Sequence, residues 1–184
     1  MKIFIGCSKS EKIPKKYFED SQKLFDEILK DNDLVFGAKN EGIMGLAYRT
    51  AKKYNRKITA MTSTFYEDEL KKLSCDEAIL TDTMLESTLK IYEACDVVIF
   101  LPGGYGTVYE LFTAIQSYLG GEIKQKIILY NCAGYYDKLI SFLDSAYKDG
   151  FILEEDYDSL VILNSVSEVV DYIKNISLDS EQFK

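Results

Sequence analysis

Apolar residues from Val97 onward end abruptly in the segment Pro102-Gly-Gly-Tyr-Gly-Thr107, and a lone carboxylate, Glu110, follows. This segment holds three of the eleven glycines and one of the two prolines of the chain. Glycine lets a backbone come close to a ligand, and the N-terminus of a following helix offers free N–H groups and a partial positive charge. The pattern therefore indicates a phosphate-binding turn, in which backbone N–H groups of residues 103–107 and the Thr107 hydroxyl hold the anion.

Alternating apolar runs and helical periodicities must position this turn. Strands are expected at residues 2–6, 33–37, 57–61, 77–81, 96–101, 125–131 and 160–164. Helices are expected at residues 17–32, 42–55, 82–95, from about 107 to 119, 135–150 and 166–176. Thr83 and Glu86 form a capping-box pattern, whereas the polar segment 62–76 is predicted to be irregular. The alternation predicts an α/β fold with a parallel sheet and right-handed crossovers.

Three of the expected strands end at, or run directly into, a glycine: Gly6, Gly37 and Gly103. In a parallel sheet these ends share one edge, and ligands bind there, near the point where the strand order reverses. We therefore expect the three loops to form one pocket. The chain lacks the Gly-Lys-Ser/Thr ending of a Walker loop, and "GCSKSEK" rather than a G-x-G-x-x-G pattern follows the first strand. A tightly held NAD or FAD is therefore not expected.

The composition excludes several kinds of site. The chain has no histidine, which removes His-based zinc sites, the Ser-His-Asp triad and the Cys-His pair. Cys7, Cys75, Cys95 and Cys132 are scattered without a C-x-x-C pair, and we expect small buried residues of a reduced compartment. The net charge of −8 argues against a nucleic-acid or membrane-surface partner.

Length and hydropathy predict one domain over residues 1–184, with a frayed tail from about residue 177 to 184. No apolar run approaches the ~20 residues of a membrane span. The apolar run at the N-terminus is too short for a signal peptide, so we expect a cytoplasmic protein.

The segment "PGGYGTVYE" matches the pattern P-G-G-x-G-T-x-x-E, by which the chain resembles the LOG ("Lonely Guy") family. These enzymes cleave cytokinin riboside 5′-monophosphates and are often mislabelled lysine decarboxylases. The similarity extends to the opening "IGCS", the loop ending in "GIMG" and the segment "YYDKLISFLDSAYKDGFI". The resemblance implies a Rossmann-like three-layer sandwich with a mostly parallel central sheet, a homodimer, and neither a metal nor a redox cofactor.

The resemblance also implies an activity, the hydrolysis of the N-glycosidic bond of a nucleoside 5′-monophosphate to free base and ribose 5-phosphate. Glu110 is then the catalytic residue, because a carboxylate stabilises the oxocarbenium-like sugar and positions or deprotonates water. The spacing of Thr107 and Glu110 fits a capping box equally well, with Glu110 accepting from the Thr107 backbone N–H. The expected substrate- and phosphate-binding residues are Gly103, Gly104, Tyr105, Gly106, Thr107, Ser8, Gly42, Ser87, Lys39 and Lys90.

The chain departs from the family pattern at two places. The family carries Met-x-x-Arg-Lys on the helix before the glycine segment, whereas this chain has Met84-Leu85-Glu86-Ser87-Thr88. The family loop Gly-Gly-Gly-Ser-x-Gly-Leu-Met-Gly is replaced by a segment with Lys39 at its third position. Lys39 or Lys90 could replace the lost positive charge, although a solvated surface lysine is the more common case.

Two functions therefore stay open from the sequence. One is a LOG-type hydrolase, and the other is a nucleotide-binding protein that keeps the phosphate turn and has lost turnover. An AMP-like nucleoside monophosphate is the expected ligand in both, without a choice of base. Tyr105, Tyr109 and Tyr135 could stack on that base or belong to the core or a dimer surface.

Overall fold

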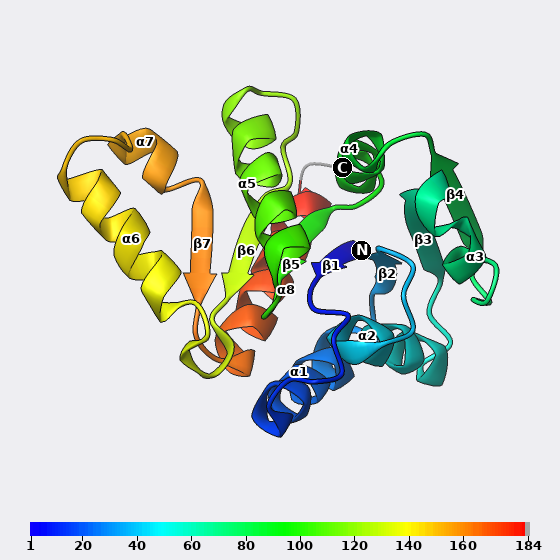
Figure 1. The fold of residues 1–184 in the computed structure, drawn as a ribbon. Coiled ribbons are helices and arrows are strands. Elements are labelled where there is room, and N and C mark those ends of the chain that lie inside the picture. The colour runs from blue at the N-terminus through cyan, green and yellow to red at the C-terminus, as the bar shows by residue number, and fades with distance from the viewer. Residues whose placement is uncertain (183–184) are drawn as a thin grey trace.

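The computed structural model describes the backbone of residues 1–182 and the side chains of residues 1–176. Seven strands form one sheet in the order β4-β3-β2-β1-β5-β6-β7, and every neighbouring pair is parallel (Figure 1). The expected parallel α/β sheet is therefore confirmed. The strands are β1 (Lys2–Gly6), β2 (Asp33–Phe36), β3 (Ile58–Ser63), β4 (Glu77–Thr81), β5 (Val97–Phe100), β6 (Lys126–Tyr130) and β7 (Leu160–Leu163).

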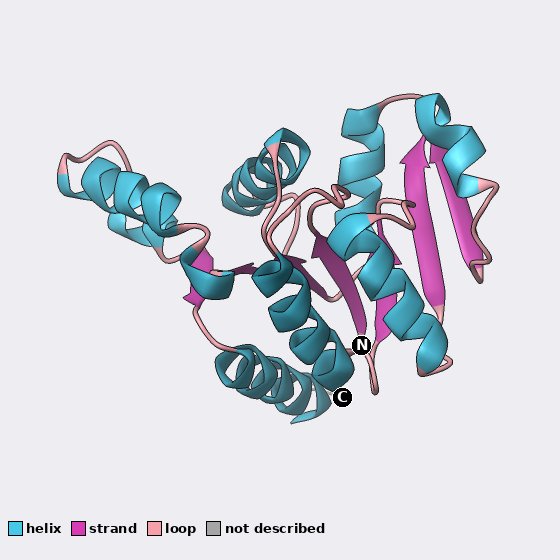
Figure 2. Cartoon of the chain, turned by 60° about the horizontal axis from the view of Figure 1, so that its bottom comes forward, coloured by secondary structure: helices cyan, strands magenta, loops and turns pink. Residues whose placement is uncertain are grey.

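Helices cover both faces of the sheet, which gives the three layers expected from the resemblance (Figure 2). Helices α1, α2 and α8 share one apolar core with the sheet, and α4, α5 and residues of α6 share the other. The helices are α1 (Lys15–Ile28), α2 (Gly42–Lys53), η1 (Thr64–Tyr66), α3 (Glu67–Leu70), α4 (Met84–Glu93), α5 (Tyr105–Leu119), η2 (Cys132–Gly134), α6 (Asp137–Lys148), α7 (Glu154–Tyr157) and α8 (Val166–Gln182).

Central strands are apolar on both faces because both are covered. In β1, Ile3 and Ile5 belong to one core, while Phe4 belongs to the other, and all three side chains are buried. This explains the continuous apolar runs, since a strand with one solvated face would alternate with polar residues.

Strand order places a topological switch point between β1 and β5. The chain adds β2, β3 and β4 on one side of β1 and then returns to add β5 on the other side. Loops that leave the carboxyl ends of β1 and β5 therefore diverge to opposite faces and leave a crevice between them. The Ser8 N–H donates to the Pro102 carbonyl over 3.0 Å, which ties the two loops together at the start of this crevice.

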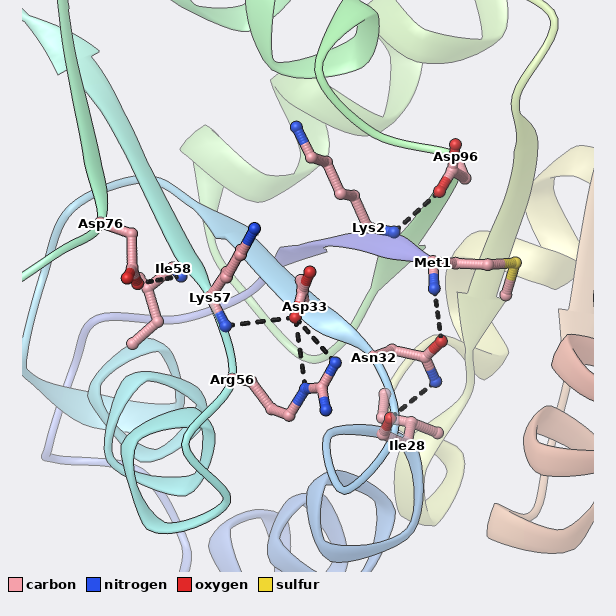
Figure 3. Close-up of polar contacts among 10 residues, drawn as sticks. All are labelled: Met1, Lys2, Ile28, Asn32, Asp33, Arg56, Lys57, Ile58, Asp76 and Asp96. Carbon is pink, nitrogen blue, oxygen red and sulfur yellow. Dashed lines mark hydrogen bonds and ion pairs between the residues drawn. The ribbon is translucent and has the colours of Figure 1, made fainter.

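Aspartates fix the opposite, amino edge of the sheet (Figure 3). Carboxylates at the start of one strand accept the backbone N–H at the start of its neighbour: Lys2 donates to Asp96 (2.7 Å), Lys57 to Asp33 (3.1 Å) and Ile58 to Asp76 (2.8 Å). These bonds satisfy N–H groups that lie at the ends of the ladder, and they hold neighbouring strands in one register.

The segment 62–76 is more ordered than expected. It contains the end of β3, the 3₁₀ turn η1 and the single-turn helix α3. Elements this short show no periodicity, so they could not be detected from the pattern of apolar residues. Helix α8 continues through residues 177–182, and residues 183–184 of the expected frayed tail lie outside the described residues.

Candidate functional site

Loops after β1, β2, β3 and β5 enclose a cavity of about 310 Å³ together with α4 and α5. Gly6, Gly37 and Gly103 all lie at this carboxyl edge, as predicted, because β1, β2 and β5 are parallel neighbours. The lining residues are Cys7, Ser8, Lys9, Ser10, Gly37, Lys39, Met44, Met61, Thr62, Tyr66, Met84, Ser87, Thr88, Ile91, Gly104, Tyr105, Gly106, Thr107 and Glu110.

The start of α5 forms one wall of this cavity. Helical hydrogen bonding begins with the Val108 N–H, which donates to the Gly104 carbonyl over 3.0 Å, so the N–H groups of residues 105–107 have no partner within the helix. A Cβ added to Gly104 or Gly106 would meet no atom within 4 Å. Open space therefore lies in front of a helix N-terminus, which is a suitable place for an anion.

The glycine segment is held from behind by tyrosines. The Tyr135 hydroxyl donates to the Gly103 carbonyl and the Tyr136 hydroxyl to the Leu101 carbonyl, each over 2.7 Å. A Cβ on Gly103 would lie 2.1 Å from Thr107 Oγ1, so the Thr107 side chain needs the glycine beneath it. Gly103 does not line the cavity and supports the turn, while Gly104 faces the open space.

Glu110 lies in the second turn of α5 and lines the same cavity. Burial raises the pKa of its carboxyl to about 7, and Glu110 in turn adds to the effect of burial in raising the pKa of the neighbouring Cys7 thiol. The Tyr92 hydroxyl donates to the Glu110 carbonyl over 2.5 Å and fixes this turn of the helix from α4. A carboxyl group of this kind exchanges protons near neutral pH, as a general base requires.

The capping-box interpretation of Glu110 is wrong. Helix α5 begins at Tyr105 with Gly104 as its N-cap, so Thr107 is the third residue of the helix and not the cap. Glu110 is therefore too far along the helix to bond the N–H of the cap residue. The helix begins at Tyr105, two residues before the start that the sequence pattern predicted. Glu110 therefore lies in the second turn of α5, where its carboxyl group faces the cavity.

Lys39 and Lys90, the two candidates for the missing positive charge, have different surroundings. Lys90 forms an ion pair with Glu86 over 2.7 Å on the exposed face of α4 and does not line the cavity. Lys39 is only 9% exposed, lines the cavity and holds Nζ 4.2 Å from the centroid of the Tyr66 ring. The surface-lysine interpretation thus describes Lys90 and is wrong for Lys39.

Ser87 and Thr88 are buried and line the cavity from α4. The Thr88 hydroxyl donates to the Met84 carbonyl over 2.9 Å. The place where the family pattern has arginine and lysine therefore faces the cavity in this chain too, with hydroxyl groups in place of cations.

Gly42 lies outside the cavity lining and has a positive φ of 60°. An added Cβ would lie 2.5 Å from the Lys9 backbone, so this glycine allows the loop after β1 to pack on the start of α2. Ser8 lines the cavity, and its carbonyl accepts the Met44 N–H over 3.1 Å. Tyr105 lies at the cavity mouth and is 99% exposed.

Sequence reasoning missed most of the apolar wall and one aromatic residue. Met44 from α2, Met61 from β3 and both Met84 and Ile91 from α4 line the cavity, with Tyr66 from η1. Thr62 lies near the end of β3, and Tyr66 lies three residues after that strand. Because the carboxyl ends of parallel strands meet at one edge of the sheet, their positions could have been used to predict both residues. The methionines carried no signal, because apolar residues at helical spacing are also what a core requires.

A family model described as "Possible lysine decarboxylase" matches residues 44–173 of the chain. The chain belongs to this family, the LOG family. A probable cytokinin riboside 5′-monophosphate phosphoribohydrolase of Oryza sativa subsp. japonica is 29% identical over 182 residues, which cover 98% of this chain and 74% of the relative. A cytokinin riboside 5′-monophosphate phosphoribohydrolase of Arabidopsis thaliana is 32% identical over 153 residues, with 82% and 70% covered.

Solved structures confirm the fold of this LOG-family chain. The Moco carrier protein of Chlamydomonas reinhardtii superposes with a TM-score of 0.68 at 14% identity, covering 97% of this chain and 98% of the other. The molybdenum cofactor binding protein of Rippkaea orientalis gives a TM-score of 0.68 at 21% identity, with 95% and 96% covered. At these identities the likeness concerns the Rossmann-type architecture alone.

Proposed function

We propose that this LOG-family protein hydrolyses the N-glycosidic bond of a nucleoside 5′-monophosphate and releases the free base and ribose 5-phosphate. One observation carries the proposal: Glu110 faces the same cavity as the unpartnered N–H groups at the start of its own helix. The curated relatives are named as phosphoribohydrolases of a riboside 5′-monophosphate, which supports the same reaction class.

The helix sets the distance between the two parts of the site. Glu110 lies five positions after Tyr105, which corresponds to about 8 Å along the helix axis. Helical side chains lean toward the N-terminus of their helix, so the Glu110 carboxylate lies closer to the N–H groups than this, within reach of the anomeric carbon of a ribose 5-phosphate. With the phosphate on the N–H groups of residues 105–107, the anomeric carbon lies beside the Glu110 carboxylate.

Glu110 then acts on the bond that breaks. As the bond between C1′ and the base nitrogen lengthens, positive charge builds on the ribose, and the ionised carboxylate stabilises it. Water adds to C1′ and gives one proton to Glu110, and that proton passes on to the nitrogen of the departing base, so that Glu110 is ionised again at the end of the reaction. A pKa of about 7 lets the same carboxyl hold that proton and release it again near neutral pH.

This chain holds the phosphate without an arginine. Its two arginines are engaged elsewhere: Arg49 donates to Asn40 over 2.8 Å and Arg56 to Asp33 over 3.0 Å, and neither lines the cavity. Backbone N–H groups and the helix dipole provide the anion site instead. Ser87 and Thr88 stand where the family pattern has two cations. Nucleotide binding without turnover is therefore the competing function.

We further propose that the protein is a homodimer joined through α4 and α5. Large apolar side chains are exposed on both helices: Met84 and Leu85 on α4, and Tyr105, Tyr109 and Leu119 on α5. A monomer has no need for such a group of side chains in water, whereas an interface uses them. This surface borders the cavity, since Met84 and Tyr105 also line it.

Incubation with nucleoside 5′-monophosphates tests the activity. We expect free base and ribose 5-phosphate to form in equal amounts, measured by liquid chromatography and a reducing-sugar assay. Nucleotide binding without base release would show that the protein binds nucleotides and is not a hydrolase. In that case the double variant Ser87→Arg, Thr88→Lys decides whether the lost cations are the cause, because activity should appear when they return.

A further inference from the structure

Two lysine side chains face one tyrosine ring on the β2–β3 side of the cavity. Lys39, in the loop after β2, holds Nζ 4.2 Å from the centroid of the Tyr66 ring. Lys9, in the loop after β1, holds Nζ 5.3 Å from the same centroid. All three residues line the cavity, and they form what we name the Lys9–Lys39–Tyr66 cluster.

The two ammonium groups form no close ion pair, although the Glu69 carboxylate interacts electrostatically with both. Among the described residues, neither Lys9 nor Lys39 lies within ion-pair distance of an acidic side chain. Burial lowers the pKa of Lys39, the charges of Glu69 and Glu41 oppose this, and those of Lys9 and Lys72 lower it further. Two like charges at one ring, one of them buried, are unfavourable unless an electron-rich group meets them. The cluster is therefore arranged to receive such a group.

Strand order indicates which part of a nucleotide reaches the cluster. Strand β5 leads into the phosphate turn, and β2 lies two strands away from it. Two strand spacings amount to about 10 Å. A nucleoside monophosphate with its phosphate at the start of α5 and its ribose at Glu110 therefore extends its base toward β2 and β3, where Tyr66 offers an aromatic surface.

We propose that the Lys9–Lys39–Tyr66 cluster recognises the base and selects nucleotides that carry a carbonyl oxygen on the base edge distal to the ribose. These are 6-oxopurine and 4-oxopyrimidine nucleoside 5′-monophosphates. An ammonium group has only hydrogens to donate, so it pairs with a carbonyl oxygen and is mismatched with the amino group of adenine or cytosine. The inference rests on the proposed function only in placing a nucleoside monophosphate in this cavity.

Two matched pairs of nucleotides test the selection. IMP and AMP, and likewise UMP and CMP, differ at this edge of the base and share the ribose and phosphate. We expect the wild-type protein to bind IMP and UMP about 10- to 100-fold more tightly than AMP and CMP by calorimetry, as for one hydrogen bond to a charged donor. Equal affinities within each pair would overturn the proposal, and this comparison needs no variant.

Variants then assign the discrimination to the cluster. Lys39→Met keeps the aliphatic stem beside Tyr66 and should abolish the preference within each pair. The control Lys71→Met makes the same change of charge at an exposed residue directly after α3, where Lys71 pairs with Glu67 over 3.0 Å, and should leave the preference intact. A preference that survives Lys39→Met would also overturn the proposal.

Ribose 5-phosphate separates base recognition from phosphate binding. It lacks a base, so Lys39→Met should bind it as tightly as the wild type does. A loss there would mean that the cluster holds the phosphate, which contradicts the proposal. Base release is measured separately. A binding preference without base release would support this base subsite and contradict the proposed hydrolase activity. Equal binding within each pair together with base release would contradict the subsite and support the hydrolase activity.

Discussion

At the residue scale, Glu110 has a carboxyl group in the cavity wall and lies on the helix whose N-terminus faces the same cavity. Glu110→Gln keeps the size of the side chain and removes the charge that stabilises an oxocarbenium-like sugar. We expect turnover to fall about 10²- to 10³-fold while nucleotide binding is retained. Base release and calorimetry measure the two effects, and an unchanged turnover would exclude Glu110 from catalysis.

The same variant reveals a pH dependence of stability. Burial raises the folded-state pKa of Glu110 to about 7 from 4.5, so between these values the folded state binds more protons than the unfolded state. Stability conferred by this group is therefore present at pH 5 and lost as the pH rises through 7. Relative to Glu110→Gln, the wild type should lose about 2–3 kcal/mol of unfolding free energy between pH 5 and pH 8.

Urea denaturation of both proteins at the two pH values measures that difference. The comparison cancels the titration of the other acidic residues, because they are shared. A parallel pH response in wild type and variant would show that the Glu110 carboxyl titrates normally.

Two adjacent glycines should respond differently to substitution. A Cβ on Gly104 meets open space, so Gly104→Val should keep the fold and obstruct the anion site. A Cβ on Gly103 collides with Thr107, so Gly103→Ala should lower the melting temperature. Calorimetry with ribose 5-phosphate and thermal unfolding separate the two cases. Unimpaired ligand binding by Gly104→Val would place the phosphate elsewhere.

At the residue scale, the sequence indicated Glu110 and Thr107 by their spacing, left two interpretations of Lys39 open and gave no indication of Tyr66. Tyr66 reaches Lys39 across the gap between two loops, and no local pattern encodes that contact. Burial of Lys39 is likewise a tertiary property, since a lysine in a glycine-containing loop is ordinarily solvated.

At the scale of elements, α4 depends on its N-terminal cap. The Thr83 hydroxyl accepts the Glu86 N–H over 3.1 Å, as the sequence pattern predicted, while the Glu86 carboxylate accepts the Asp82 N–H over 3.2 Å rather than that of Thr83. Thr83→Ala should lower the unfolding free energy by about 1 kcal/mol. Chemical denaturation measures this, and Thr83→Ser, which keeps the acceptor, should show a much smaller loss.

Most helices and strands were predictable, because burial of one or both faces of an element imposes a regular spacing of apolar residues. Strand β5 is apolar throughout since helices cover both sides, and α2 begins at the glycine where the pattern changed. The short elements η1 and α3 were not predictable, because three or four residues cannot display a period. The start of α5 was displaced by two residues, and that small error left Glu110 ambiguous.

At the scale of the whole molecule, the exposed apolar surface of α4 and α5 leads to a prediction about assembly. We expect light scattering to give twice the mass of the chain at micromolar concentration. Leu85→Glu places a charge on this surface and should yield a monomer, whereas Leu153→Glu, which makes the same change at an exposed residue before α7, should remain a dimer. A monomeric wild type, or the reverse response of the two variants, would contradict the proposed interface.

The aspartates at the amino edge of the sheet stabilise the strand register far from the residues that line the cavity. Asp33, Asp76 and Asp96 hold the strand starts in register through backbone N–H groups, at the end of the sheet remote from the cavity. Loop residues at the carboxyl edge are thus free to change without unsettling the alignment of strands. A substitution at the carboxyl edge, such as Lys39→Met, is therefore expected to change ligand recognition and to leave the strand register unaltered.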